Sequence, residues 1–109
     1  FLPNLAETVI PQSKIVDYLL SETHEYGRYK AVFFTLFGFH TNEWQGFADA
    51  LHDHATKNEV SHAEHSSYGV RYIIEGFLIT PSTREPMVRV VWFIAHNDSN
   101  PRLVTAYPL

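Results

Sequence analysis

The sequence predicts an α+β fold in which three N-terminal helices precede a four-stranded antiparallel β-meander. In the first half of the chain, apolar residues recur at helical spacing, most clearly at Trp44, Phe47, Ala48 and Leu51. Beyond residue 58 the period changes to two, and the apolar runs become rich in β-branched and aromatic residues. Short turns join these runs, and strands joined by short turns are antiparallel. We therefore expect the helices to pack on one face of the sheet.

The first helix is predicted to begin at Ser13, after a lead-in formed by residues 1–12. The lead-in contains two prolines and shows no helical period, so we expect it to be extended. From Ser13 onward, three apolar side chains fall on one side of a helix: Ile15, Tyr18 and Leu19.

The second and third helices carry clearer end signals. The second begins near Arg28, and Gly38 is well placed as its C-terminal cap. Its residues are apolar on most sides, so we expect it to be largely buried. Thr41 or Asn42 is expected to cap the third helix, which ends near residue 57.

The strands are predicted at residues 60–66, 70–80, 87–96 and 102–109. Alternation in the third strand places one apolar row toward the core: Val88, Val90, Trp92 and Ile94. Arg89 takes the opposite face, and Arg71 shares a face of the preceding strand with Glu75. If the two arginines lie on the same open face, the sheet presents a small cationic spot, and this depends on the register.

Chain length limits the domain organisation. A chain of 109 residues has room for one hydrophobic core, so we assign residues 1–109 to a single domain. No apolar run has the length of a bilayer and no leader pattern opens the chain, which predicts a cytoplasmic protein without a membrane partner. The chain begins at Phe1 rather than Met, so we expect a processed product or a domain of a longer protein.

Composition excludes several functional classes. Cysteine is absent, which excludes disulfides, zinc–thiolate sites and cysteine nucleophiles. The net charge of −4 and the eight Lys and Arg residues argue against a broad track of phosphate contacts, although a pocket for one or two phosphates remains compatible. The sequence carries no phosphate loop, dinucleotide fingerprint, paired-carboxylate motif or Ser/His/Asp order, and we expect no cofactor.

Four of the seven histidines fall in one acidic segment: His52, His54, His62 and His65. Imidazoles and carboxylates together bind zinc, nickel or copper. However, His52 and His54 are two residues apart on a helix and point about 200° apart around its axis. His62 and His65 lie three apart in a strand, on opposite faces. The spacing therefore predicts exposed histidines rather than a metal site.

His24 lies in the break between the first two helices, close in sequence to Arg28 and Lys30. A histidine in such a place can transfer a proton while the cations hold an anion, or it can simply bond the backbone and shape the loop. Lys30 either lies along the core or faces a pocket. On the last strand, Thr105 and Tyr107 share a face and can contact a phosphate, although both are also common strand formers.

Landmarks from Leu2 to Leu109 resemble a bacterial family of domains of unknown function. They include Leu2-Pro3-Asn4, Lys30-Ala31, Phe33-Phe34, Trp44, Tyr68-Gly69, Trp92 and Arg102 through Pro108. Members of that family look like small stand-alone proteins or the C-terminal ends of larger ones. Val90 departs from the pattern of that family, which often has Thr at the position before Val-Trp. Any role of a threonine hydroxyl at this position would be lost in this chain.

The order of elements and the ending Val104–Pro108 are also similar to the barnase/EndoU/colicin/RelE-like ribonucleases and toxins. This resemblance implies RNA cleavage without a metal, in which the substrate's own 2′-hydroxyl attacks the neighbouring phosphate. A base removes the hydroxyl proton, an acid protonates the leaving oxygen, and cations stabilise the charge on the phosphorane.

Carried onto this sequence, the resemblance implies four catalytic residues: His24, Lys30, Thr105 and Tyr107. His24 would be the base or acid, the phosphate would be stabilised by Lys30, Arg71 or Arg102, and the two hydroxyls would position it. Substrate binding would fall to Arg71, Tyr72, Arg89 and Arg102. A second landmark histidine is absent, so the other proton carrier would be Lys30, Tyr72 or Tyr107.

Two functional hypotheses follow. The first is a ribonuclease-like toxin or effector domain that acts on RNA and is held in check by a small cognate inhibitor protein. The alternative is a non-catalytic interaction module of a bacterial toxin system, antitoxin-like or immunity-like, which the acidic net charge and aromatic content favour. The nuclease hypothesis requires His24, Lys30 and Thr105 to converge on one concave site, whereas the interaction hypothesis requires an exposed apolar patch or sheet edge.

Overall fold

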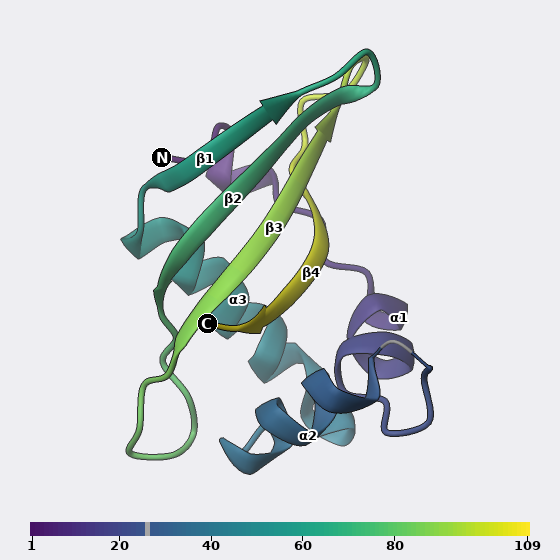
Figure 1. The fold of residues 1–109 in the computed structure, drawn as a ribbon, viewed down its shortest axis with the longest axis vertical. Helices are drawn as coiled ribbons and strands as arrows, with labels where there is room; N and C mark the ends of the chain where they lie inside the picture. The colour runs from purple at the N-terminus through teal and green to yellow at the C-terminus, as the bar shows by residue number, and fades with distance from the viewer. Residues whose placement is uncertain (26) are drawn as a thin grey trace.

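The computed structural model describes residues 1–25 and 27–109, with helical elements first and strands last (Figure 1). The helical elements are η1 (Leu5–Glu7), α1 (Gln12–Lys14), η2 (Ile15–Leu19), α2 (Arg28–Leu36), η3 (Thr41–Glu43) and α3 (Trp44–Lys57). The strands are β1 (Val60–His65), β2 (Gly69–Phe77), β3 (Met87–Ala95) and β4 (Arg102–Pro108). This order confirms the predicted α+β class and its division into a helical half and a β half.

The first helix is less regular than its sequence pattern suggests. α1 continues directly into η2, a π-helical segment in which the N–H of Leu20 donates to the carbonyl of Ile15 at 2.8 Å. Such wide turns are rare and often occur at functional sites. η2 buries Ile15 and Leu19 in the core and leaves Tyr18 half-buried.

The lead-in is also more structured than expected. It contains the 3₁₀ turn η1, and Val9 forms a parallel bridge with Arg102 at the start of β4. The N–H of Val9 donates to the carbonyl of Pro101 at 2.7 Å. Val9 therefore covers part of the outer edge of β4, where an unpaired strand would otherwise expose its backbone groups.

α2 ends where the sequence predicts but is not buried as expected. Gly38 follows the helix with φ of 100°, a left-handed conformation that glycine adopts without strain. Ala31 and Phe34 are buried, yet three apolar side chains are 74%, 51% and 78% exposed: Tyr29, Val32 and Leu36. The expectation of a largely buried helix was wrong because, among the described elements, α2 packs mainly against η2 and β4.

The predicted caps of the third helix were also wrong. α3 begins at Trp44, preceded by the 3₁₀ turn η3, and the cap positions of these two elements are His40 and Glu43. Neither cap makes a side-chain hydrogen bond. Thr41 and Asn42 lie inside η3, because the chain enters the helix through a tighter first turn.

The sheet has the strand order β1-β2-β3-β4, and all of its neighbours are antiparallel, as predicted. Arg71 on β2 lies opposite Phe93 on β3, and Glu75 lies opposite Arg89. Because Arg89 and Phe93 are four residues apart on one strand, Arg71 and Arg89 share a face, which confirms that part of the prediction. A register irregularity at Val91 interrupts the pairing of β3 with β4.

The hydrophobic core lies against the other face of the sheet. Val88, Val90 and Trp92 are fully buried, whereas Ile94 at the end of the predicted row is half-buried. Against them packs a cluster of rings in which Phe47 lies 4.7 Å from Phe34 and 4.6 Å from Phe39, measured between centroids. Figure 1 shows α3 passing behind the strands and α1 beside β4. Packing of all three helices on one face stays a prediction.

None of the helices formed by the described residues has the length and apolar character that crossing a membrane requires.

Candidate functional site

A cleft of about 760 Å³ opens between the first helix and the sheet. Its polar walls come from four parts of the chain: Lys14, Asp17, Tyr18, His24, Arg71 and Thr105. Three of these residues, His24, Arg71 and Thr105, belong to the predicted site. They are far apart in sequence, and the fold places them on one concavity.

Tyr18 lies at the centre of the polar contacts around this cleft. The ammonium group of Lys30 donates to the Tyr18 hydroxyl at 2.6 Å, and the Thr105 hydroxyl lies 3.2 Å from the same oxygen. The Lys30 nitrogen is also 4.9 Å from the centroid of the Tyr18 ring, and that of Lys14 is 5.5 Å away. One phenol therefore connects the first helix, α2 and β4, and it has two cations beside it.

These neighbours change the acidity of the Tyr18 hydroxyl. Burial by itself raises the pKa of a tyrosine, because the phenolate loses hydration. The hydrogen bonds with Lys30 and Thr105, together with the charges of Lys30 and Lys14, outweigh burial and lower the pKa of Tyr18 below its usual value of 10.0.

His24 is held in place by the loop that precedes α2. The backbone N–H of Gly27 donates to Nδ1 of His24 at 3.0 Å, and the imidazole meets the Tyr18 ring edge-on with centroids 4.9 Å apart. Because Nδ1 accepts this bond, the neutral ring carries its proton on Nε2. His24 is thus set up as a hydrogen-bond donor through Nε2.

Glycine at position 27 allows the two helical segments to come this close. A β-carbon on Gly27 would lie 2.2 Å from the carbonyl oxygen of Tyr18, far inside van der Waals contact. The missing side chain lets the start of α2 pack directly on the backbone of η2. That approach brings His24 and Lys30 to Tyr18.

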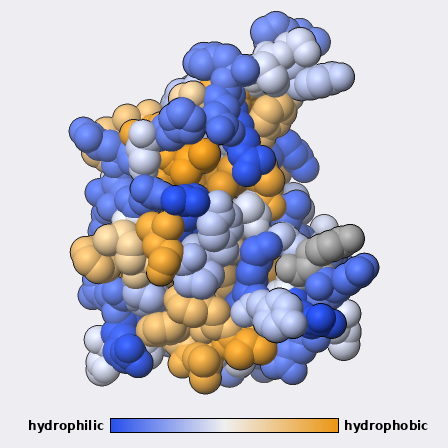
Figure 2. Space-filling model, viewed as in Figure 1, coloured by the Kyte–Doolittle hydropathy of each residue, from blue (hydrophilic) through white to orange (hydrophobic). Residues whose placement is uncertain are grey.

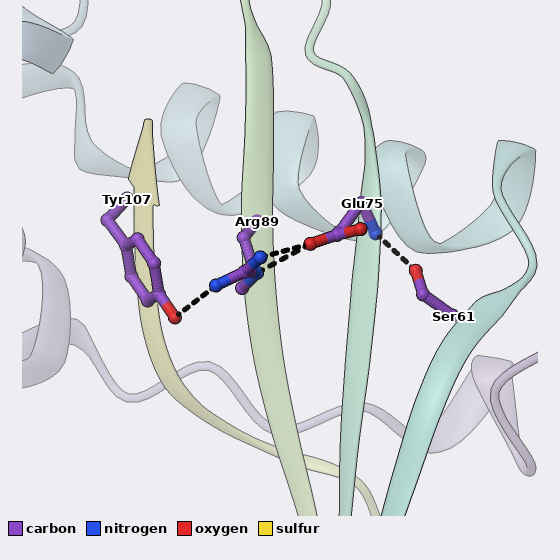
Figure 3. Close-up of polar contacts among 4 residues, drawn as sticks. All are labelled: Ser61, Glu75, Arg89 and Tyr107. Carbon is purple, nitrogen blue, oxygen red and sulfur yellow. Dashed lines mark hydrogen bonds and ion pairs between the residues drawn. The ribbon is translucent and has the colours of Figure 1, made fainter. Parts of the chain in front are cut away.

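A second polar group, formed by Glu75, Arg89 and Tyr107, spans three neighbouring strands of the sheet (Figure 3). The guanidinium of Arg89 donates through Nε to a carboxylate oxygen of Glu75 at 2.7 Å and through Nη1 to the hydroxyl of Tyr107 at 3.2 Å. The Lys30 nitrogen lies 6.0 Å from the centroid of the Tyr107 ring, which connects the two groups. Arg89 is already paired with Glu75, so the predicted cationic spot is largely neutralised at this position.

Five predicted residues are not part of the cleft lining: Lys30, Tyr72, Arg89, Arg102 and Tyr107. Tyr72 pairs with Trp92, and its side chain packs against the hydrophobic core on the opposite face from Arg71. Arg102 is exposed at the start of β4, opposite Phe93, and is not among the residues that line the cleft.

Sequence reasoning missed Tyr18 and Lys14 as site residues. Tyr18 was assigned to the apolar side of the first helix, and its ring does pack against the core. A signal was present, because tyrosine in an apolar row carries a hydroxyl that must find a partner when it is partly buried. The partners, Lys30 and Thr105, come from distant parts of the chain and leave no local pattern.

The remaining histidines have separate environments. Nδ1 of His52 lies 3.0 Å from the hydroxyl of Thr8, and Nε2 of His54 lies 3.2 Å from the carbonyl of Gly76. His62 is 3.6 Å from a carboxylate oxygen of Glu64. Within the described parts of the chain, no three His, Asp or Glu side chains are grouped closely enough to hold a metal ion.

These elements define a class of α+β proteins in which helices precede a four-stranded antiparallel meander and a polar cleft lies beside the last strand. The same fold occurs in a solved contact-dependent growth inhibition toxin–immunity protein complex from Klebsiella pneumoniae 342. The chain matches a chain of that complex with a TM-score of 0.71 and 21% sequence identity, covering 95% of each.

The chain belongs to the family described as Domain of unknown function (DUF6883), whose model matches residues 1–109. This confirms the expectation of membership in a domain family of unknown function. No curated protein sequence matches the chain.

Proposed function

We propose that this chain is a ribonuclease-like toxin or effector domain that cleaves RNA through attack of the substrate's 2′-hydroxyl on the neighbouring phosphate, without a metal ion. The observation that carries the proposal is the convergence of His24, Arg71 and Thr105 on one cleft, with Lys30 bonded to the Tyr18 hydroxyl at its wall. A proton-transferring ring, cations and hydroxyls are the groups that this chemistry uses.

In this proposal the cleft binds one phosphate rather than a long stretch of RNA. Lys14 and Arg71 line the cleft and supply positive charge, and Thr105 supplies a hydroxyl. The Nε2–H of His24 donates to a phosphate oxygen and stabilises it as charge develops in the phosphorane. Such a compact site agrees with a chain whose net charge is −4, because few phosphate contacts are required.

The fold comparison supports a role in a toxin system. The matched solved structure is a toxin bound to its immunity protein, and one of its chains shares this fold over 95% of its length. A domain of this kind needs a cognate inhibitor protein in the cell that makes it. We therefore propose a small protein as the natural partner, in addition to RNA.

The exposed apolar face of α2 is a specific observation that favours a second candidate, an immunity-like interaction module. Tyr29, Val32 and Leu36 form this face, and Figure 2 shows apolar surface gathered where α2 lies. The guanidinium of Arg28 lies 5.1 Å from the Tyr29 ring centroid at its border. A face of this composition suits a protein partner. If the chain is a toxin, this face binds its inhibitor. If the chain is an immunity-like module, this face is the surface that binds the toxin.

The proposal is tested by incubating purified protein with labelled total bacterial RNA in EDTA. The wild type is compared with His24→Ala/Lys30→Ala and with a matched control, His62→Ala/Lys57→Ala, which removes one histidine and one lysine away from the cleft. We expect cleavage by the wild type and the control and none by the cleft variant. Absence of cleavage by folded wild-type protein would transfer support to the interaction module.

A further inference from the structure

Besides the carboxylate of Asp17, the cleft contains a candidate proton acceptor in Tyr18, which the sequence did not reveal. RNA cleavage through the 2′-hydroxyl needs a group that takes the hydroxyl proton. Nδ1 of His24 already accepts the Gly27 N–H at 3.0 Å, so the neutral imidazole presents a donor rather than an acceptor. Tyr18 lines the same cleft, and the Lys30 ammonium lies 2.6 Å from its hydroxyl oxygen.

We propose that Tyr18 is a catalytic residue whose phenolate oxygen accepts the 2′-hydroxyl proton of an RNA substrate in the cleft, with Lys30 holding that oxygen in place. This inference rests on the proposed ribonuclease function and assigns its base.

The proton balance of the step is complete. The 2′-oxygen forms a bond to phosphorus as its proton passes to the Tyr18 oxygen, and the bond between phosphorus and the 5′-oxygen breaks. Water protonates the departing 5′-oxygen, and the resulting hydroxide takes the proton from Tyr18. The products are a 2′,3′-cyclic phosphate and a 5′-hydroxyl, and the enzyme returns to its starting state.

The charges around Tyr18 favour this role. Lys30 from α2 and Lys14 from α1 flank the ring, and both lower the pKa of its hydroxyl. Asp17 and Arg71 line the same cleft with opposite charges, and His24 meets the ring edge-on at 4.9 Å. Two ammonium groups beside one phenol increase the phenolate fraction at a given pH, which is what a base requires.

The other hydroxyl-bearing candidates are less suitable. Tyr107 receives a hydrogen bond from Arg89 at 3.2 Å and does not line the cleft. Tyr72 packs against the core on the other face of the sheet. Among the described residues, Tyr18 is the tyrosine that combines access to the cleft with an ammonium partner.

The test is Tyr18→Phe, which removes one oxygen and keeps the ring that packs in the core. Cleavage of labelled total bacterial RNA is followed from pH 6 to 10, and product ends are identified by mass spectrometry. For the wild type we expect a rate that rises with pH to a plateau below the usual tyrosine range, and 2′,3′-cyclic phosphate ends. The variant should lose roughly 10²–10⁴-fold in rate and lose the pH-dependent rise.

Lys30→Met is the second variant, because it keeps the Tyr18 hydroxyl and removes its ammonium partner. It should shift the midpoint of the pH profile upward, a change that a purely structural role would not produce. Circular dichroism and binding of an uncleavable 2′-O-methylated RNA report whether each variant is folded and still binds.

The outcomes separate this inference from the proposed function. If the wild type cleaves RNA and Tyr18→Phe cleaves with the same rate and pH profile, the assignment of Tyr18 is overturned while the ribonuclease function stands. If the wild type does not cleave, the proposed function and this inference fail together. A large loss in the variant with intact binding of the methylated RNA supports both.

Discussion

Gly27 packs directly on the backbone of Tyr18, and a β-carbon at position 27 would lie 2.2 Å from the Tyr18 carbonyl oxygen. Gly27→Ala must therefore push η2 away from the start of α2. We expect a loss of about 1–3 kcal/mol in the free energy of unfolding, the usual cost of overpacking. Urea denaturation measures this loss, and the displacement should also reduce RNA cleavage.

Gly46→Ala is the matched control for this substitution. Gly46 lies inside α3, and beyond its chain neighbours and the backbone of its own helix no described atom lies within 4 Å of the added carbon, so alanine should stabilise the protein by about 0.5–1 kcal/mol. Equal stabilisation by the two substitutions would show that the contact between Gly27 and Tyr18 is not a constraint.

His54 makes the stability of the fold dependent on pH. Its side chain is 1% exposed, and Nδ1 has no hydrogen-bond partner among the described residues. Burial lowers the pKa of His54 below 6.5, against the opposing effect of its hydrogen bond to Gly76. The unfolded chain therefore takes up the proton first as the pH falls. The stability that the fold gains from a neutral His54 is complete above pH 6.5 and is lost as the pH falls through the lowered pKa of His54.

We accordingly expect the free energy of unfolding in urea to fall between pH 7.5 and pH 4.5 more steeply for the wild type than for His54→Leu. His65→Ala is the control, because His65 is exposed on β1 and its removal should leave the slope nearly unchanged. Parallel pH profiles for the wild type and His54→Leu would contradict a role for this buried imidazole.

The fold was largely predictable because its signals are local. Alternation in β3 identified the buried row that contains Val88, Val90 and Trp92, and Gly38 marked the end of α2. Helix starts were less predictable: the signal at Thr41 and Asn42 did not reveal that a 3₁₀ turn would precede α3. The exposure of α2 depends on how much of the molecule surrounds it, and composition alone does not contain that information.

The site was predictable in part, for a similar reason. His24, Lys30 and Thr105 have chemistry that can be read from residue type, and the structure brings them to one region. From its sequence position Tyr18 cannot be told from a tyrosine that only packs in the core. The hydrogen-bond partner Thr105 lies 87 positions away in sequence. Arg89 was expected to face substrate, but Glu75 directly opposite on β2 pairs with it.

The outward face of α2 should tolerate polar substitution without loss of stability. Leu36 is 78% exposed, so Leu36→Ser should change the free energy of unfolding by no more than about 0.5 kcal/mol. Phe34→Ala on the inward face is the contrast, since Phe34 is fully buried and its loss should cost about 3–5 kcal/mol. Thermal or urea unfolding measures both. A large loss for Leu36→Ser would mean that this face already packs within the protein.

Arg71 and Arg89 share a face of the sheet, but their environments predict different roles. Arg71 lines the cleft, and its side chain is 45% exposed beside Glu64, 3.5 Å away. Arg89 is held by Glu75 and Tyr107. Arg71→Met should therefore weaken binding of 2′-O-methylated RNA about tenfold, the effect of losing one charge-assisted hydrogen bond of about 1.5 kcal/mol.

Arg89→Met, with the same change in charge and shape, should leave that binding nearly unchanged and lower the stability only slightly, because exposed ion pairs contribute little. Fluorescence titrations with both variants decide between the two arginines. A stronger binding defect in Arg89→Met would mean that RNA displaces Glu75 and that the phosphate site lies over the centre of the sheet, rather than in the cleft beside the first helix.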